Sequence, residues 1–190
     1  ESRTRGGPTR YTQANLPQWS GQYLRDRAKT ATWYHGAILQ IPTYLSLLTP
    51  EYQTRFVREM YHYSGSNAPQ WPGSYCWPEG MMRRFAQYGG ARMNLVLTPE
   101  LIIDMRNAAK TLLTQIHIGR EFVQDPGGVP RLGPAVPQWF GETIGFWDGD
   151  TLVTWTANIQ AWTLTHSMFE TSPKMETVET WKPALDASGK

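Results

Sequence analysis

The spacing of apolar residues predicts one helix in the first third of the chain. Thr49 can cap the exposed amides of the first turn, Pro50 suits the first helical position, and Glu51 complements the helix dipole. Apolar residues then recur at helical spacing and form one face. These residues are Tyr52, Phe56, Met60 and Tyr63. We therefore predict a helix over residues 50–63.

Residues 101–118 carry an apolar pattern with two interpretations. Seven positions fit one helical face. They are Leu101, Met105, Ala108, Ala109, Leu112, Leu113 and Ile116. The same stretch also divides into two strands, 101–106 and 111–118, about a turn at Asn107 to Lys110. Periodicity alone favours the helix.

The clearest pattern in the sequence is a β-hairpin. Residues 142–147 and 151–156 are rich in β-branched and aromatic side chains, and they flank Asp148-Gly149-Asp150. An Asp-Gly pair tolerates the positive φ that a tight hairpin turn requires. We predict a hairpin here and a last strand at residues 175–182.

Three segments have no regular period and contain many Gly and Pro residues. Residues 1–20 are predicted to form an extended arm that Trp19 anchors, and residues 64–80 to form a structured loop around aromatic side chains. Residues 124–141 form a longer irregular segment. Ordered loops of this length often bind ligands or act as lids.

These patterns predict a single α+β domain over residues 1–190, because a chain of this length supports one hydrophobic core. An extended arm at 1–20 is followed by a helix and aromatic loops at 21–90. Residues 91–190 are predicted to form an antiparallel β-meander, arranged as a sandwich or an incomplete barrel.

Composition narrows the classes of partner. The net charge is only +2 and the basic residues are dispersed, which argues against nucleic acid as a main partner.

No apolar run approaches the roughly 20 residues of a membrane-spanning helix. Cys76 is the single cysteine, so no internal disulfide can form. The first residues lack the layout of a signal peptide, so we expect a mature form if the protein is exported.

Several motifs occur in the same order as in one protein family. Residues 139–153 (WFGETIGFWDGDTLV) resemble the G-x-S-I-G-x-W-x-G-D-T-L-V-V signature of a large, mostly uncharacterised family of exported bacterial proteins. Residues 17–21 resemble its P-x-W/F-S-G start, and residues 48–53 its L-T-P-E-Y-Q helix. Residues 76–83 and 116–120 resemble its C-x-P-x-G-x-P-R and I-Y-x-D-G-R segments.

The resemblance implies a periplasmic or extracellular location and a strand pair over 101–118. It transfers no activity. Two positions depart from the family pattern: Ile118 replaces an Asp before Gly119, and Gln115 replaces an Arg. Any polar site that the family builds on those two positions is therefore weakened here.

The same family continues past the equivalent of residues 186–190 with another strand or two. A meander without those strands leaves backbone donors and acceptors open along one edge. We therefore expect another polypeptide, or a second copy of this chain, to cover an open sheet edge.

Nine Trp and nine Tyr residues are a high aromatic share, which a core and its rim explain most simply. Such side chains serve cores, ligand contacts and subunit interfaces alike. Four of them are candidates for binding a partner or an apolar ligand. They are Trp71, Trp77, Trp139 and Trp147.

The candidates for acid-base or anion-binding chemistry are His117, Arg120, Asp148 and Asp150. The two Asp residues flank the hairpin turn and could act as an acid/base pair, although Asp at such turns usually bonds its own backbone. Arg120 and Arg83 could each bind a carboxylate through two parallel hydrogen bonds, although surface ion pairing is the simpler explanation.

Two further groups are weaker candidates for chemistry. Glu59 and His62 have the i, i+3 spacing that could place two metal ligands on one helix face, although an exposed helix face explains them more simply. Cys76 would need a nearby His to act as a nucleophile, and its aromatic neighbours suit a small buried residue instead. The sequence does not identify a cofactor.

Two functional hypotheses follow. The first is an exported non-catalytic subunit or binding module whose aromatic residues contact a partner chain or an apolar ligand. The second is an enzyme of unknown reaction with a pocket beside the meander, lined by Trp147, His117, Arg120 and Asp148. Catalysis predicts that at least two of these polar groups converge in one concave pocket.

Overall fold

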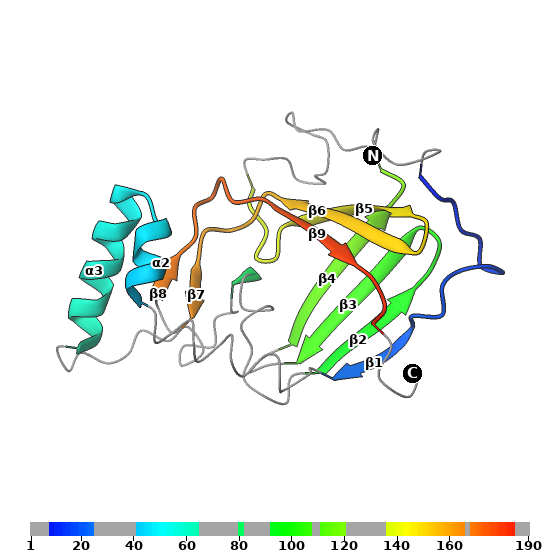
Figure 1. Ribbon diagram of the computed structural model, residues 1–190, viewed down its shortest axis with the longest axis horizontal. Coiled ribbons are helices and arrows are strands. Elements are labelled where there is room, and N and C mark those ends of the chain that lie inside the picture. Colours follow the sequence, from blue (N-terminus) through cyan, green and yellow to red (C-terminus); the bar gives the residue numbers. More distant parts are fainter. Residues whose placement is uncertain are drawn as a thin grey trace.

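A computed structural model describes most of the β-rich part of the chain (Figure 1). The described residues are 8–24, 41–64, 80–81, 92–107, 111–120, 136–165 and 168–184. Seven strands form one curled mixed sheet, an open half-barrel, in the order β1-β2-β3-β4-β5-β6-β9. They are β1 (Gly21–Leu24), β2 (Arg92–Leu97), β3 (Leu101–Asn107), β4 (Thr111–Ile118), β5 (Glu142–Asp148), β6 (Thr151–Ala157) and β9 (Thr177–Trp181).

A smaller layer lies at one end of this sheet (Figure 1). It contains the helices α2 (Ile41–Leu47) and α3 (Pro50–Ser64) and the strand pair β7 (Thr163–Thr165) and β8 (Met168–Glu170). Helix α3 confirms the predicted helix at 50–63, whereas α2 was not predicted. Gln53 fixes the turn between the two helices, because its side-chain amide donates to the carbonyls of Leu45 and Leu48 at 3.1 and 3.0 Å.

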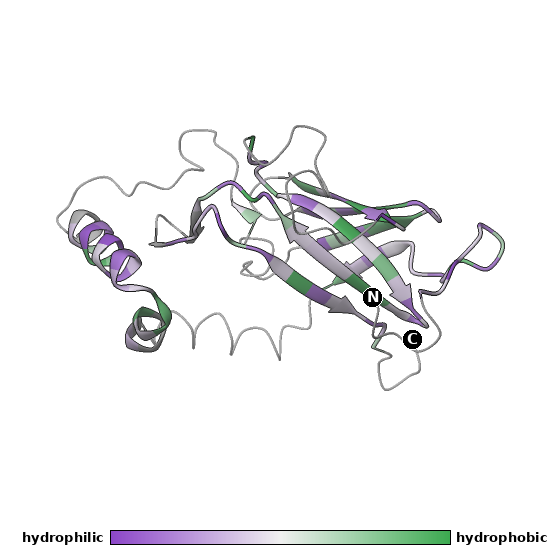
Figure 2. Ribbon diagram, turned by 90° about the horizontal axis from the view of Figure 1, so that it is seen from above, coloured by the Kyte–Doolittle hydropathy of each residue, from purple (hydrophilic) through white to green (hydrophobic). Residues whose placement is uncertain are grey.

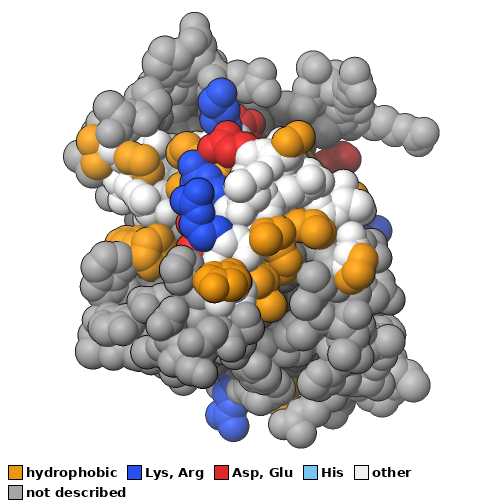
Figure 3. Space-filling view, turned by 90° about the vertical axis from the view of Figure 1, so that its left-hand side faces the viewer, with side chains coloured by type: hydrophobic (Ala, Val, Ile, Leu, Met, Phe, Trp, Pro, Cys, Tyr) orange, Lys and Arg blue, Asp and Glu red, His pale blue; other side chains and the backbone are white. Residues whose placement is uncertain are grey.

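Helix α3 is amphipathic, and part of its apolar surface faces outward. Phe56 is buried, whereas Val57 and Tyr61 are exposed. Arg55 forms ion pairs with Glu51 on the same helix and with Glu170 on β8. On this side of the molecule, exposed hydrophobic side chains lie next to a group of charged side chains (Figure 3).

Residues 101–118 form two antiparallel strands, so the single-helix interpretation is wrong and the strand interpretation is confirmed. Burial along β4 has a period of two: Leu112, Thr114 and Ile116 are buried, while Leu113 and Gln115 are exposed. Figure 2 shows hydrophobic and hydrophilic residues alternating along strands of the sheet. Pairing with β2 and β5 on either side stabilises the extended form over an isolated helix.

The predicted hairpin and last strand are also confirmed. Strands β5 and β6 pair in antiparallel register from Glu142 opposite Ala157 to Asp148 opposite Thr151. Gly149 in the turn has φ +59°, as the Asp-Gly signal required. Strand β9, within the predicted range 175–182, pairs antiparallel with β6.

The prediction of an antiparallel meander is wrong at one junction. Strands β4 and β5 are parallel, and they pair only at Ile116 with Thr143, His117 with Ile144 and Ile118 with Gly145. Neighbouring parallel strands need a long crossover connection, which residues 119–141 supply. The irregular segment predicted at 124–141 therefore belongs to a crossover. The part before residue 136 lies outside the described residues.

The core lies inside the curl of the sheet, and the N-terminal arm covers one end of it. Trp147 is 1% exposed and meets the rings of Tyr11 and Trp19 edge to face, with centroids 5.2 and 4.9 Å apart. The backbone N–H of Thr9 donates to the carbonyl of Trp147 at 2.7 Å. Leu16 is buried in the same cluster. Trp19 therefore anchors the arm, as predicted.

The interior of the half-barrel also contains polar groups. Asp104 on β3 is 1% exposed and accepts two hydrogen bonds from the guanidinium Nε of Arg106, at 2.9 and 3.1 Å. The guanidinium lies over the ring of Trp181 on β9, 5.3 Å from its centroid. A buried charge needs such partners because desolvation is costly. The ion pair lies within β3, and the contact of Arg106 with Trp181 connects β3 to β9, the last strand in the sheet order.

Candidate functional site

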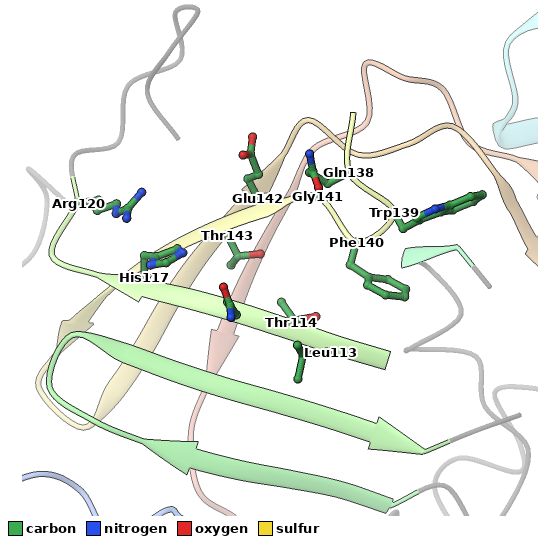
Figure 4. Close-up of a pocket in the computed structure, with 11 residues that line it drawn as sticks. Leu113, Thr114, His117, Arg120, Gln138, Trp139, Phe140, Gly141, Glu142 and Thr143 are labelled. Carbon is green, nitrogen blue, oxygen red and sulfur yellow. The ribbon is translucent and has the colours of Figure 1, made fainter. Parts of the chain in front are cut away.

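A pocket of about 570 Å³ opens where β4 and β5 separate (Figure 4). Strand β4 and Arg120, two residues beyond its end, form one wall, and the segment entering β5 forms the other. The lining residues are Leu113, Thr114, Gln115, His117, Arg120, Gln138, Trp139, Phe140, Gly141, Glu142 and Thr143.

The short parallel pairing explains why a pocket forms here. Pairing between the two strands begins only at Ile116, so the first half of β4 does not have β5 beside it. The chain entering β5 bends away instead. Gly141 has φ +69°, a left-handed conformation that favours glycine, and its N–H donates to the carbonyl of Gln138 at 3.1 Å. The turn at 138–141 thus separates the second wall from the first.

Backbone hydrogen bonds hold this second wall against the end of β6. The N–H of Gln138 donates to the carbonyl of Asn158 at 2.9 Å, and the N–H of Gln160 donates to the carbonyl of Gln138 at 2.7 Å. The side-chain amide of Asn158 donates to a carboxylate oxygen of Glu142 at 2.9 Å. Trp139 meets Trp162 edge to face at 5.0 Å. These contacts place Trp139 and Glu142 on a supported turn.

The first wall takes its side chains from alternate positions of β4. Leu113, Gln115 and His117 lie on the face opposite to the buried Thr114 and Ile116. Gly119, with φ +81°, ends the strand just before the exposed Arg120. Figure 4 shows His117 and Arg120 toward one end of the pocket and Trp139 and Phe140 toward the other.

Buried threonines lie at the base of the pocket. Thr114 and Thr143 line it but are themselves 5% and 2% exposed. The hydroxyl of Thr143 shares a 2.8 Å hydrogen bond with that of Thr156 on β6. The base of the pocket is therefore polar and hydrogen-bonded rather than apolar.

The structure brings together three of the residues singled out from the sequence. His117, Arg120 and Trp139 line one pocket. Trp147 does not, because it is buried in the core. Asp148 lies at the opposite end of β5 from the pocket, roughly 16 Å from Thr143 at about 3.3 Å per residue.

The two turn aspartates therefore belong to a separate part of the surface. Asp150 accepts a hydrogen bond from the hydroxyl of Thr151 at 3.3 Å and forms an ion pair with Lys182 at 3.4 Å. Both Asp148 and Asp150 are exposed. The pocket expected from the sequence is therefore not assembled from all four residues, but two of its polar groups, His117 and Arg120, do converge in one pocket.

Other candidates cannot be placed in the site. Trp71, Trp77 and Cys76 lie outside the described residues, and so does the side chain of His62. Glu59 lies on α3 and is not part of the pocket. Within the described ranges, no group of three His, Cys, Asp or Glu side chains is arranged to hold a metal ion. None of the described helices is long and apolar enough to cross a membrane.

Sequence reasoning missed the pocket residues Gln115, Gln138, Phe140, Glu142 and Thr143. In the sequence, Gln115 stands out only as a departure from the family pattern. Glu142 and Thr143 begin the predicted hairpin, but no local signal showed that the start of β5 faces the open edge of β4.

Comparisons with protein-family models, curated proteins and solved structures give no match to this chain. The resemblance to exported bacterial proteins therefore stays a prediction, and the geometry of the pocket is what indicates a function.

Proposed function

We propose that this protein is a non-catalytic binding module whose ligand enters the pocket between β4 and residues 138–143. The observation that carries the proposal is the convergence of Trp139, His117 and Arg120 on one cavity of about 570 Å³. Sites for small ligands usually measure about 300–1,000 Å³ and combine an apolar lining with a few polar groups. The pocket meets both conditions.

The side chains suit an amphipathic ligand. Leu113, Trp139 and Phe140 offer apolar and aromatic surface, which would pack against the body of the ligand. Arg120 offers a planar cation that can bind a carboxylate or sulfonate. The ligand class is therefore an apolar or aromatic molecule with one anionic group.

Titration with 8-anilino-1-naphthalenesulfonate, an aromatic anion, tests this function. Trp139→Ala and Arg120→Ala should each weaken binding at least about tenfold, which corresponds to about 1.4 kcal/mol. Tyr61→Ala on α3 and Arg92→Ala on β2 are matched controls, because both residues are exposed and neither lines the pocket. Equal affinities for all four variants would remove the basis of the proposal.

A second candidate is an enzyme of unknown reaction. It is favoured by one observation: His117 and Arg120 line the same pocket, together with Glu142. Catalysis predicts that a bound molecule is converted to product and that His117→Ala abolishes conversion while binding persists. Mass spectrometry of probe molecules after long incubation distinguishes the two, since a binding module returns them unchanged.

We also propose membership of the exported bacterial family, with a periplasmic or extracellular location. The strand pair at residues 101–118, which that resemblance implied, supports this proposal. Fractionation of the source cells followed by immunodetection would test it. Detection in the cytoplasm alone would contradict it.

The arrangement of the sheet supports a partner at an open edge. Strands β1 and β9 are the outermost strands, and among the described residues no strand pairs with their outer sides. The partner would be another polypeptide or a second copy of this chain. Native mass spectrometry of protein purified from its source tests this, and a uniform monomer would count against it.

A further inference from the structure

The pocket exposes backbone groups of β4 as well as side chains. The N–H of Ile118 donates to the carbonyl of Glu100, which precedes β3, at 2.9 Å. The N–H of Gly119 donates to the carbonyl of Gly145 on β5 at 3.0 Å. Because backbone groups of successive strand residues point to opposite sides, Gln115 and Leu113 direct theirs toward the β5 side, as Gly119 does.

Strand β5 does not extend far enough to pair with that edge. Its pairing with β4 begins at Ile116 and Thr143. The N–H of Leu113, its carbonyl, and the N–H of Gln115 therefore have no strand partner in the described part of the chain. Both residues line the pocket. The pocket thus contains a segment of open strand edge about three residues long, roughly 10 Å.

We infer that the natural ligand is a short extended segment of another polypeptide, which adds to the edge of β4 at Leu113–Gln115. This inference rests on the proposed function and names its ligand class. Addition of a peptide strand to an open edge uses main-chain hydrogen bonds for affinity and side-chain pockets for specificity. This mode of binding fits the site because one cavity contains both side chains that can contact a peptide and backbone groups of β4 that have no strand partner among the described residues.

The side chains define which segment fits. An apolar or aromatic residue of the peptide would contact Trp139, Phe140 and the 45% exposed Leu113. A carboxylate, either a side chain or a C-terminus, would pair with Arg120. Glu142 disfavours a second acidic group, because it lines the same cavity and already accepts a hydrogen bond from Asn158. The expected segment is therefore apolar with a single negative charge.

The tripeptide acetyl-Thr-Phe-Val with a free C-terminal carboxylate is a suitable probe, measured by isothermal titration calorimetry. Its analogue with N-methylated Phe and Val amides keeps the side chains and the charge but cannot pair as a strand. We expect the analogue to bind at least about tenfold more weakly. Amidation of the C-terminus should weaken binding to the native protein and have no effect in the Arg120→Ala variant.

A variant of the protein tests the same edge from the other side. Leu113→Pro removes the N–H that faces the pocket and leaves intact the β4 N–H groups that face β3. It should lose peptide affinity while retaining that for 8-anilino-1-naphthalenesulfonate. If this variant does not fold, the N-methylated analogue on the native protein still decides the question.

Three outcomes would overturn the inference. In the first, the peptide and its N-methylated analogue bind equally well. In the second, neither peptide binds but 8-anilino-1-naphthalenesulfonate does, so the pocket function survives without a peptide ligand. A dimer of this chain that the peptide dissociates would instead assign the edge to a second copy. Failure of the naphthalenesulfonate as well would remove the proposed function itself.

Discussion

Substitution of Gly141 tests how the second wall of the pocket is built. The backbone there has φ +69°, and a Cβ atom would lie 2.6 Å from Cγ2 of Thr156 and 2.7 Å from the carbonyl oxygen of Ala157. The carbonyl oxygen belongs to the end of β6 and cannot move as a side chain can. Gly119 is the matched control, since its φ is +81° but no described atom lies within 4 Å of its Cβ position.

The two substitutions should lower the free energy of unfolding by different amounts, because only Gly141 lacks space for a Cβ atom. A non-glycine residue in the left-handed region costs about 1–2 kcal/mol, which is the whole effect expected for Gly119→Ala. Overpacking adds about 1–3 kcal/mol at Gly141, so Gly141→Ala should lose about 2–5 kcal/mol of unfolding free energy. For a chain of this size, each kcal/mol lowers Tm by about 2–4 °C.

The free energy of unfolding can be measured by urea denaturation monitored through tryptophan fluorescence. The slope m shows whether unfolding stays two-state. Gly141→Ala should also weaken ligand binding, because it displaces the turn that carries Trp139. A loss within about 0.5 kcal/mol of that for Gly119→Ala would refute the reasoning, since additivity errors are of that size. The turn would then not be held against β6 as described.

Other predictions concern the interior. Trp147→Ala should cost about 3–5 kcal/mol, as expected of a fully buried ring in the core. Thr143→Val and Thr156→Val should each cost about 1–3 kcal/mol, and the double variant less than their sum, because each single change leaves the other hydroxyl buried without its partner. Arg106→Met should cost about 3–5 kcal/mol by removing the ion-pair partner that the buried Asp104 has on β3, and Asp104→Asn in the same chain should restore part of the loss. All can be measured by the same urea denaturation.

Local chemistry made some of the fold predictable from the sequence. The Asp148-Gly149 turn and the start of α3 each depend on residues only a few positions apart, so both could be predicted from the sequence. The tetrapeptide Leu97–Glu100 shows the limit of such signals. It repeats the letters of the helix start at Leu48–Glu51, yet Thr98 donates its N–H to the carbonyl of Leu101 at 2.8 Å and forms a strand turn. Pairing with distant strands decided between the two.

The parallel pairing of β4 and β5 could not be read from the sequence. The relative direction of the two strands depends on the connection formed by residues 119–141, and the spacing of apolar residues does not predict that connection. Within β5, every residue from Thr143 to Trp147 is buried, so polarity did not show which residues face the interior. Trp147 was therefore predicted as a binding residue that lines a pocket, although it lies in the core.

Three residues of the site, His117, Arg120 and Trp139, were candidates from the sequence, and only the first two come from one segment. His117 and Arg120 lie three positions apart at the end of β4, and both line the pocket. Glu142 and Gln138 lie across the β4–β5 separation, so they are near neighbours in space and distant in sequence. That Glu142 and Gln138 line the pocket could be known only from the register of β4 and β5 and from the turn at Gly141.

Backbone amide chemical shifts measured during titration with the tripeptide would test the central claim most directly. If the ligand binds at the separation of β4 and β5, saturable shifts should concentrate at Leu113, Gln115, His117 and residues 138–143. Shifts confined to β1 or β9 would contradict the account, and so would the absence of any saturable change with both the tripeptide and 8-anilino-1-naphthalenesulfonate.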